Sequence, residues 1–276
     1  MKIFVVSLSR VEIRTKYIKA HLDSLKVDYE LIDAVDYLNL TPADFDVLSD
    51  QEAVRQNPYL SQGVIACSLS HVKIYKHIVE NNVGVSLIIE DDAALPKNIK
   101  KILDIVEREI KDNEIISLSY FNHHQAKEHT DLSRHQRKSV GEGCELVYPT
   151  DLKDIASSMA YIITKDVAQK MIDIIMPVSV QTDYWGVYYD KHAFGSFRCL
   201  YPVQVKAAAI RSSIEYDSAK SLASKVASWV RQYNVPILIS YLDRRANKIQ
   251  GEKYKFVFVD DQPFNMVSQG AGIQAV

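Results

Sequence analysis

The sequence from Leu87 to Asp92 reads Leu-Ile-Ile-Glu-Asp-Asp, an apolar run followed at once by three carboxylates. Together with Val85, the run predicts a buried central strand that ends where the acids begin. In open α/β sheets, ligands bind outside the carboxyl ends of the strands, which is where these acids fall. Clustered carboxylates repel each other unless a cation lies among them, and their hard oxygens suit Mg²⁺ or Mn²⁺. The stretch therefore predicts a strand-end metal site; the alternative is an acidic turn that only solvates the strand.

Strand-like and helix-like segments alternate on both sides of this stretch. Compact apolar or β-branched runs predict further strands over residues 2–8, 29–33, 115–120, 159–164 and 198–205. Apolar residues at helical spacing predict helices after Ser9, after Thr41, over 63–81, after Pro96 and over 166–176. Ser9 with Glu12 forms a capping-box pattern, and Pro42 suits the first position of the helix capped by Thr41. The alternation predicts an α/β fold, with a mostly parallel central sheet and helices on both faces.

Composition divides the chain into three expected parts. Residues 1–215 carry the alternation and are expected to form one domain. Residues 216–260 are basic and are expected to form a helical C-terminal segment, broken at Pro236. Residues 261–276 have little periodicity and are expected to be a disordered tail. Inside the first part, residues 122–143 are polar and His-rich and are expected to be a mobile loop.

The overall composition excludes several classes of function. The net charge of −2 provides no excess of positive charge for a nucleic-acid partner. The three cysteines are far apart and form no CxxC pair, which favours a reducing compartment. The first apolar run is too short for a signal peptide, and no run approaches the length of a membrane span, so we expect a cytoplasmic protein. The chain contains no GxGxxG, GxxxxGK[ST], GxSxG or HExxH motif, which argues against a dinucleotide site, a P-loop, a hydrolase elbow and a zinc protease.

Six stretches, in their order and spacing, resemble one known family. They are Val6–Arg10 with Arg14, Tyr29–Ala34, Tyr59–His71, Leu87–Asp92, Ser158–Lys165 with Ala168, and Asp183 after Pro177. The chain resembles glycosyltransferase family 25, which contains lipooligosaccharide and collagen glycosyltransferases. The sequence departs from the family at Pro177-Val-Ser-Val-Gln-Thr-Asp183, where more residues separate the proline from the acid.

The resemblance implies a GT-A fold, a UDP-sugar donor, a metal-assisted displacement and inversion at the anomeric carbon. The similarity to the bacterial branch implies transfer of galactose or glucose to a lipooligosaccharide or lipopolysaccharide acceptor. In this interpretation Asp92 and Glu90 bind the metal. Because strand side chains alternate, Glu90 and Asp92 are expected on one side, and Asp91 on the other, where it can hold a backbone or ribose group. A single functional acid among the three fits the pattern as well.

The first two strands supply further expected donor-binding residues, namely Ser7, Arg10, Arg14 and Asp33. An arginine fork matches phosphate oxygens, and the resemblance falls on Arg14, although both arginines could be ordinary exposed helix residues. Asp33 could accept from uracil or ribose, or could cap a turn.

His71 lies on the helix before the acidic strand and matches a Ser-His pair of the family. It is expected to bind substrate, with a structural role as the alternative. Cys67 lies one turn earlier, but Cys67 and His71 alone make an incomplete metal site. We therefore expect Cys67 to be a small buried apolar residue.

An inverting transfer needs a general base for the acceptor hydroxyl, and Asp183 is the expected base. Tyr184 and Trp185 follow it and could pack against a sugar ring. A further metal ligand, or the N-cap of a helix over residues 184–191, are the alternatives for Asp183.

Two other classes of function remain at this point. A non-catalytic protein that binds a nucleotide sugar or a carbohydrate would need the fold and the aromatic residues but no metal. A nucleotidyltransferase would usually need a glycine-rich loop near the N-terminus, and residues 7–16 contain no glycine. The basic segment could pack on the domain, or it could bind the cytoplasmic face of the inner membrane peripherally.

Overall fold

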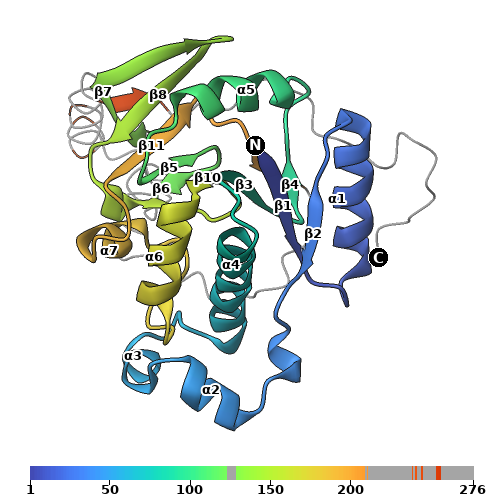
Figure 1. Ribbon diagram of the computed structural model, residues 1–276. Helices are drawn as coiled ribbons and strands as arrows, with labels where there is room; N and C mark the ends of the chain where they lie inside the picture. Colours follow the sequence, from blue (N-terminus) through green and yellow to red (C-terminus); the bar gives the residue numbers. More distant parts are fainter. Residues whose placement is uncertain are drawn as a thin grey trace.

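The computed structural model describes residues 1–122 and 129–208, together with positions 210, 238, 240, 244 and 253–255. Within these residues the chain forms an α/β fold around a central sheet (Figure 1). The expected tail over 261–276 lies outside the described residues, as does most of the segment 216–260. In that segment Leu238, Ser240 and Arg244 are helical, whereas Lys253–Lys255 form a strand. The division into 1–215, 216–260 and 261–276 stays a prediction.

The central sheet has nine strands in the order β13-β7-β8-β11-β5-β10-β3-β1-β2. Their bounds are β1 Lys2–Ser7, β2 Glu30–Asp33, β3 Val85–Glu90, β5 Glu114–Ser117, β7 His129–Gly141, β8 Cys144–Pro149, β10 Ala160–Thr164, β11 Ser196–Tyr201 and β13 Lys253–Lys255. Two short ladders lie beside it, β4 (Ala93–Ala94) with β12 (Lys206–Ala207), and β6 (Phe121–Asn122) with β9 (Ile155–Ala156).

The sheet is mixed, so the expectation of mostly parallel pairing needs correction. The pairs β1–β2, β1–β3 and β11–β5 are parallel. Strand β10 runs antiparallel to both of its neighbours, β3 and β5, and β8 runs antiparallel to β11 and β7. The alternation of strands and helices suggested parallel crossovers throughout, but β10 is entered from the β7–β8 hairpin and the short strand β9, not from a crossover helix.

Helices cover both faces of the sheet, as predicted. On one face, α1 (Glu12–Leu25) and α5 (Ile99–Glu109) pack on the side chains of Val5 and Leu87. On the other face, α4 (Gln62–Glu80) and α6 (Lys165–Ile175) pack on Phe4 and Ile88. Successive side chains of a strand point to opposite faces, so β1 and β3 supply both layers. Both strands are therefore buried on both faces, which explains their nearly continuous apolar sequence.

The remaining helical segments are short. They are η1 Tyr37–Asn39, α2 Pro42–Leu48, α3 Gln51–Gln56, η2 Leu152–Asp154 and α7 Trp185–Asp190. The predicted start of α2 is confirmed, because Thr41 and Asp44 form a capping box around Pro42. The capping box predicted at Ser9 is wrong: α1 begins at Glu12, its N-cap is Val11, and no side chain caps it. The backbone N–H of Ser9 instead donates to Asp33, which ties the turn after β1 to the end of β2.

Residues 129–149 form a β-hairpin where a mobile loop was expected. Strand β7 covers His129–Gly141 and pairs with β8. The turn between them has positive φ angles at Gly141, Glu142 and Gly143, and the two glycines adopt them without steric cost. Strand β7 lies near the solvent-exposed edge of the sheet, and its polar sequence therefore lacks the hydrophobic pattern that predicts a strand. The part of the expected loop over 123–128 lies outside the described residues.

Candidate functional site at the strand ends

Three parallel strands bring predicted site residues to one edge of the sheet. Ser7 ends β1, Asp33 ends β2 and Glu90 ends β3. The register pairs Ser7 with Asp33 and Val6 with Glu90, so the three ends are level. The carboxyl ends of β1, β2 and β3 thus form the expected strand-end site.

A buried arginine joins the two aspartates after β3. Arg14 Nη2 lies 2.6 Å from Asp91 Oδ1 and 2.8 Å from Asp92 Oδ2. The other oxygen of Asp91 accepts from Ser7 Oγ at 2.9 Å and from the Leu8 N–H at 3.3 Å. Both oxygens of Asp91 therefore have protein partners, which makes Asp91 a residue that positions the turn.

This geometry corrects the predicted alternation of Glu90, Asp91 and Asp92. Strand β3 ends at Glu90, and the turn that follows directs both aspartates to the same guanidinium. Glu90 points elsewhere, to the hydroxyl of Ser158 at 2.7 Å. The rule of alternating sides applies only while the chain stays extended, and it stops at the residue where the acids begin.

Asp92 has a carboxylate oxygen that could bind a cation. Its Oδ1 is buried and has no hydrogen-bond partner among the described residues. Burial raises the pKa of Asp92 above its usual value; Arg14 opposes this effect and Asp91 adds to it. An ionised oxygen left unpaired in a buried position is unfavourable, so a hard divalent ion fits at this atom.

Glu90 lies in the same electrostatic environment. Burial raises its pKa to about 7, and the charge of Asp92 adds to the increase. The hydrogen bond from Ser158 and the charge of Arg14 partly offset it. One arginine faces three carboxylates here, so the cluster favours a further positive charge.

A second group forms around Glu90, on helix α4. Ligand atoms of Cys67, His71 and Glu90 all lie within 4.8 Å of one another, so these residues could hold a metal ion. The sequence shows Cys67 and His71 one helical turn apart, but the third member comes from β3 and is brought there only by the packing of α4 on the sheet. Cys67 was expected to be a small buried apolar residue. In the structure it is partly exposed and belongs to this group of possible metal ligands.

His71 is fully buried, so a direct contact between its side chain and a bound substrate is not available in this structure. Its Nδ1 lies 2.8 Å from the hydroxyl of Tyr161, and its Nε2 lies 4.0 Å from Glu90 Oε1. Burial lowers the pKa of His71 to about 4, so the ring is neutral near pH 7. His71, which matches the Ser-His pair of the family, therefore lies in the core next to Glu90 and does not line the surface of the site.

Asp183 lies close to the same cluster. Ser157 and Ser158 are adjacent, and they bond to Asp183 and to Glu90 respectively, which brings the two acids to the same turn. Asp183 Oδ2 accepts a hydrogen bond from the N–H of Ser157 at 3.2 Å. The alternative that Asp183 caps the next helix is wrong, because α7 has Tyr184 at its N-cap and no side-chain cap.

The turn at Ser157 links Asp183 to Glu90. Ser157 has φ of +116°, a strained value for a residue with a side chain. Its N–H bonds to Asp183, its carbonyl accepts from Trp185 Nε1 at 3.2 Å, and the next residue, Ser158, donates to Glu90. Several side chains of the site thus fix one strained turn between β9 and β10.

The two aromatic residues after Asp183 differ in exposure. Trp185 is fully buried and packs against Tyr161 and Phe197, with ring centroids 5.2 Å and 5.5 Å away. The expectation that Trp185 faces a sugar ring is therefore wrong, because the whole ring is enclosed by the core. Tyr184 is only partly buried and stays available for this role.

Arg10 and Asp33 lie on the exposed rim of the site. Arg10 pairs with Asp36 at 2.6 Å and lies over the ring of Tyr37, 5.7 Å from its centroid. Its side chain is 40% exposed, so a phosphate could still reach the guanidinium. Asp33 is exposed and accepts from Ser9, as described for the turn after β1.

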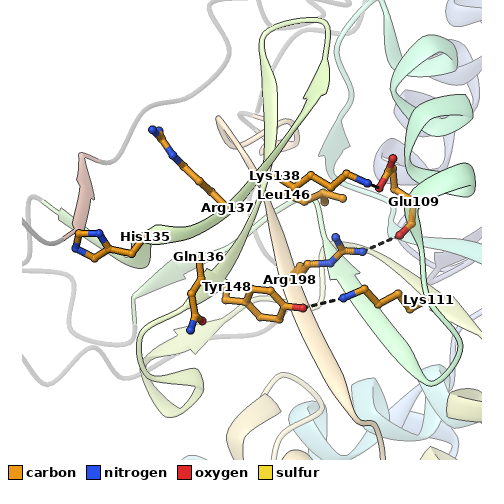
Figure 2. Close-up of a pocket in the computed structure, with 9 residues that line it drawn as sticks. All are labelled: Glu109, Lys111, His135, Gln136, Arg137, Lys138, Leu146, Tyr148 and Arg198. Carbon is orange, nitrogen blue, oxygen red and sulfur yellow. Dashed lines mark hydrogen bonds and ion pairs between the residues drawn. The ribbon is translucent and has the colours of Figure 1, made fainter.

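A separate basic pocket of about 320 Å³ lies at the other edge of the sheet (Figure 2). Among its lining residues, Arg198 comes from the first half of β11, and Lys111 precedes β5. Strand β10 is antiparallel to both β3 and β5, and β11 is parallel to β5, so β3, β5 and β11 all point in the same direction. The pocket lies at the amino ends of β5 and β11, whereas the acid cluster lies at the carboxyl end of β3. Lys138 pairs with Glu109 and Lys111 bonds to Tyr148, as Figure 2 shows. This pocket is therefore distinct from the strand-end site.

The fold and the acid cluster together define the class of α/β proteins that bind ligands at the carboxyl ends of a central sheet. Within that class the chain belongs to glycosyltransferase family 25 (LPS biosynthesis protein), whose family model matches residues 1–185. The resemblance drawn from the six sequence stretches is confirmed.

Individual relatives support the same family. A putative glycosyltransferase of Haemophilus influenzae is 32% identical over 104 residues, which are 37% of this chain and 36% of that protein. Procollagen galactosyltransferase 1-B of Xenopus laevis is 24% identical over 207 residues, 71% of this chain and 32% of that protein. The human "inactive glycosyltransferase 25 family member 3" is 31% identical over 124 residues, 43% of this chain and 20% of that protein. The matched region thus spans about a third or less of the length of these relatives.

Solved structures add little at this level of similarity. UDP-glucose pyrophosphorylase complexed with UDP-glucose aligns with a TM-score of 0.36 and 11% identity, covering 85% of this chain and 99% of that chain. In the part of the chain that the structure describes, none of the helices could span a lipid bilayer.

Proposed function

We propose that this chain is an inverting, metal-assisted hexosyltransferase on a GT-A-type domain. It transfers galactose or glucose from a UDP-sugar to a saccharide acceptor of lipooligosaccharide or lipopolysaccharide. Family membership supports the reaction class. The observation that carries the proposal is the buried acid cluster, in which Asp92 Oδ1 has no partner among the described residues although Arg14 already binds both aspartates.

Asp92 and Glu90 would hold the divalent ion, Mn²⁺ or Mg²⁺. When bound, this ion would stabilise the negative charge that develops on the leaving diphosphate. Asp91 has a different role, because both of its oxygens are used by Ser7, Leu8 and Arg14. It fixes the turn so that the free oxygen of Asp92 keeps its position. Arg10 and Asp33 are exposed at the same edge and are the proposed donor-binding residues. Ser7 and Arg14, predicted to bind the donor as well, are buried and hold Asp91 and Asp92, so their proposed role is to position the acids.

Asp183 would act as the general base. A bond forms between the acceptor oxygen and the anomeric carbon while the bond from that carbon to the diphosphate oxygen breaks. The hydroxyl proton passes to the Asp183 carboxylate, and UDP leaves with the electron pair. The link from Asp183 to Glu90 through Ser157 and Ser158 supports this role, and Tyr184 beside it is partly exposed and is the proposed contact for the acceptor ring.

A non-catalytic protein that binds a nucleotide sugar is the second candidate function. It is favoured by the fact that several relatives, such as the human family member 3, carry "inactive" in their names. Family membership alone therefore does not decide between transfer and binding. The nucleotidyltransferase alternative has no such support.

A screen of UDP-sugars tests the proposal, with UDP release measured in Mn²⁺ and in EDTA. We expect release with one hexose donor, and its loss in EDTA. Asp92→Asn should reduce this activity at least about 100-fold, because the unpaired oxygen that would bind the ion loses its charge. Asp104→Asn is the matched control, since Asp104 is exposed on α5, away from the site. Activity of Asp92→Asn within a few-fold of wild type in saturating Mn²⁺ would contradict the proposal. Donor binding without turnover would favour the binding protein.

A further inference from the structure

Three side chains of different chemistry converge beside the acid cluster. Cys67 and His71 lie one turn apart on α4, and Glu90 lies at the end of β3. Their sulfur, ring nitrogen and carboxylate oxygen all lie within 4.8 Å of one another. A thiol, an imidazole and a carboxylate are the three side-chain types that bind Zn²⁺ in proteins. Mg²⁺ and Mn²⁺, in contrast, prefer sites made of oxygen ligands.

His71 gives independent evidence for a ligand at this point. Its side chain is fully buried, yet Nε2 has no hydrogen-bond partner among the described residues and lies 4.0 Å from Glu90 Oε1. Buried polar atoms are almost always hydrogen-bonded, so the unpaired Nε2 indicates a ligand that is bound at this position. In the tautomer that carries its proton on Nδ1 and donates it to the Tyr161 hydroxyl, Nε2 has a lone pair that can bind a metal ion shared with Glu90.

We propose that Cys67, His71 and Glu90 bind a thiophilic divalent metal of the Zn²⁺ class. His71 Nε2 and Glu90 Oε1 are 4.0 Å apart, so they have to approach each other slightly to reach one ion at the usual zinc–ligand distances of about 2.0–2.3 Å. Three protein ligands leave a fourth position for water or substrate. Of the three ligands, Cys67 and Glu90 are partly exposed, whereas His71 is fully buried.

Neighbouring residues already orient two of the three ligands. The Tyr161 hydroxyl holds His71 Nδ1 at 2.8 Å and is itself bonded to the Tyr75 hydroxyl at 2.6 Å. Ser158 Oγ donates to Glu90 at 2.7 Å. Metal-binding histidines and carboxylates characteristically carry such hydrogen bonds, which fix the ring tautomer and the direction of the ligand atom.

Glu90 connects this site to the proposed reaction. The same carboxylate is assigned to the hard ion of the donor, so Zn²⁺ at Cys67 and His71 withdraws it from that ion. Zinc would therefore inhibit transfer supported by Mn²⁺. Binding of the thiophilic metal does not rest on the transfer reaction, because it needs neither donor nor acceptor.

Cobalt is the probe for the experiment, since Co²⁺ replaces Zn²⁺ and shows a charge-transfer absorption band when a thiolate binds it. Co²⁺ titrated into the reduced, full-length protein should give this band at a stoichiometry of one, and one equivalent of Zn²⁺ should abolish it. Cys67→Ser should lose the band, whereas Cys144→Ser, the matched control, should keep it because Cys144 lies elsewhere, at the start of β8. Tyr161→Phe should retain the band with an affinity lowered about 10- to 100-fold.

Two outcomes would overturn the proposal. One is a wild-type protein without a thiolate band, and the other is a band that persists in Cys67→Ser. The Asp92→Asn variant separates this test from the test of the proposed function. It should keep the cobalt band even though it loses transfer, so failure of one proposal leaves the other measurable. Circular dichroism of each variant confirms that the fold is intact.

Discussion

Asp183 could act as the general base or as a further metal ligand. One substitution distinguishes these roles, because they predict different effects on transfer and on UDP binding. Asp183→Asn keeps an oxygen that can accept from the Ser157 N–H, so the strained turn should survive. If Asp183 is the base, transfer should fall about 10²- to 10⁴-fold while binding of UDP with Mn²⁺ is unchanged. Isothermal titration with UDP and Mn²⁺ measures the second quantity. A lost affinity for UDP would instead mean that Asp183 serves the metal, and Asp190→Asn, on the exposed end of α7, is the control.

Some residues of the site can be predicted from the sequence, whereas the contacts between them depend on the fold. The acids after β3 and the nearby arginine were named from the sequence, because a strand end and a family match indicate them without coordinates. Their pairing was not foreseen, since the direction of Asp91 and Asp92 depends on a turn. Cys67 and His71 were seen one turn apart, but Glu90 joins them only through the packing of α4 on β3. The burial of Trp185 cannot be predicted from its neighbours in the sequence, because burial depends on the whole fold.

At the scale of elements, one buried ion pair holds strand β11 beside β5. Glu114, fully buried, accepts from Arg198 Nε at 2.7 Å and from Arg198 Nη2 at 2.8 Å. Burial alone would raise the pKa of Glu114, but the hydrogen bonds from Arg198, Ser196 and the Lys111 N–H lower it below its usual 4.5. The folded state therefore favours the ionised form. The resulting stability is present above about pH 4.5 and is lost as the pH falls through the lower folded value.

Glu114→Gln should lower the free energy of unfolding by about 3 kcal/mol at pH 7, because it leaves Arg198 buried without a charged partner. Between pH 5 and pH 3, in the range around the usual pKa of Glu114, the variant should also lose less stability than the wild type. Urea unfolding at each pH measures both effects. The control is Glu12→Gln, which removes a solvent-exposed pair with Lys16 and should change little. Equal pH dependence in the wild type and Glu114→Gln would show that the pair does not supply this stability.

The contact between α7 and η2 gives a second prediction at this scale. A Cβ added to Gly186 would lie 2.5 Å from Lys153 Cγ, 2.9 Å from Lys153 Cα and 3.0 Å from Lys153 N, so backbone would have to move. Gly186→Ala should therefore cost about 1–3 kcal/mol of stability, measured by urea unfolding. Gly84→Ala is the matched control, because nothing lies within 4 Å of its added Cβ. A Gly186→Ala protein as stable as Gly84→Ala would contradict the packing described here.

The elements themselves were largely predictable, and the exceptions have physical causes. Strands β1 and β3 are buried on both faces, so their apolar sequences mark them without ambiguity. Strand β7 is polar and mostly exposed where it is described, so no hydrophobic period reveals it. The direction of β10 was not predictable, since local sequence does not encode which neighbour a strand pairs with.

At the scale of the whole molecule, the charge is unevenly distributed along the chain. Residues 218–255 contain eight Lys or Arg and two acids, in a chain with a net charge of −2. Most of this segment lies outside the described residues, but Lys253 and Lys255 pair with β7 in the sheet. Each basic residue close to an anionic lipid surface contributes about 1 kcal/mol of binding, so a few suffice for reversible attachment.

We expect the protein to co-sediment with anionic vesicles at low salt and to be released at high salt. The double variant Lys220→Gln/Lys225→Gln should bind more weakly, because two basic residues of the segment are lost. Lys16→Gln/Lys19→Gln, on the exposed face of α1, has the same change of charge and should bind as the wild type does. Failure of the wild type to sediment with anionic vesicles at low salt would eliminate the peripheral membrane role. The segment would then serve the fold alone.

The place of strand β10 in the sheet has a consequence for folding, because the central part of the sheet cannot be completed until β10 has been synthesised. It lies between β3 and β5, and thereby joins the part built from β1, β2 and β3 to the part built from β5, β11, β8 and β7 (Figure 1). As the chain leaves the ribosome, residues 91–159 follow β3 before β10 appears. Until then β3 presents an unpaired, apolar edge, and such edges invite association with other chains. A nascent chain halted before residue 160 should therefore depend on chaperones, and a separately supplied piece that carries β10 could complete it.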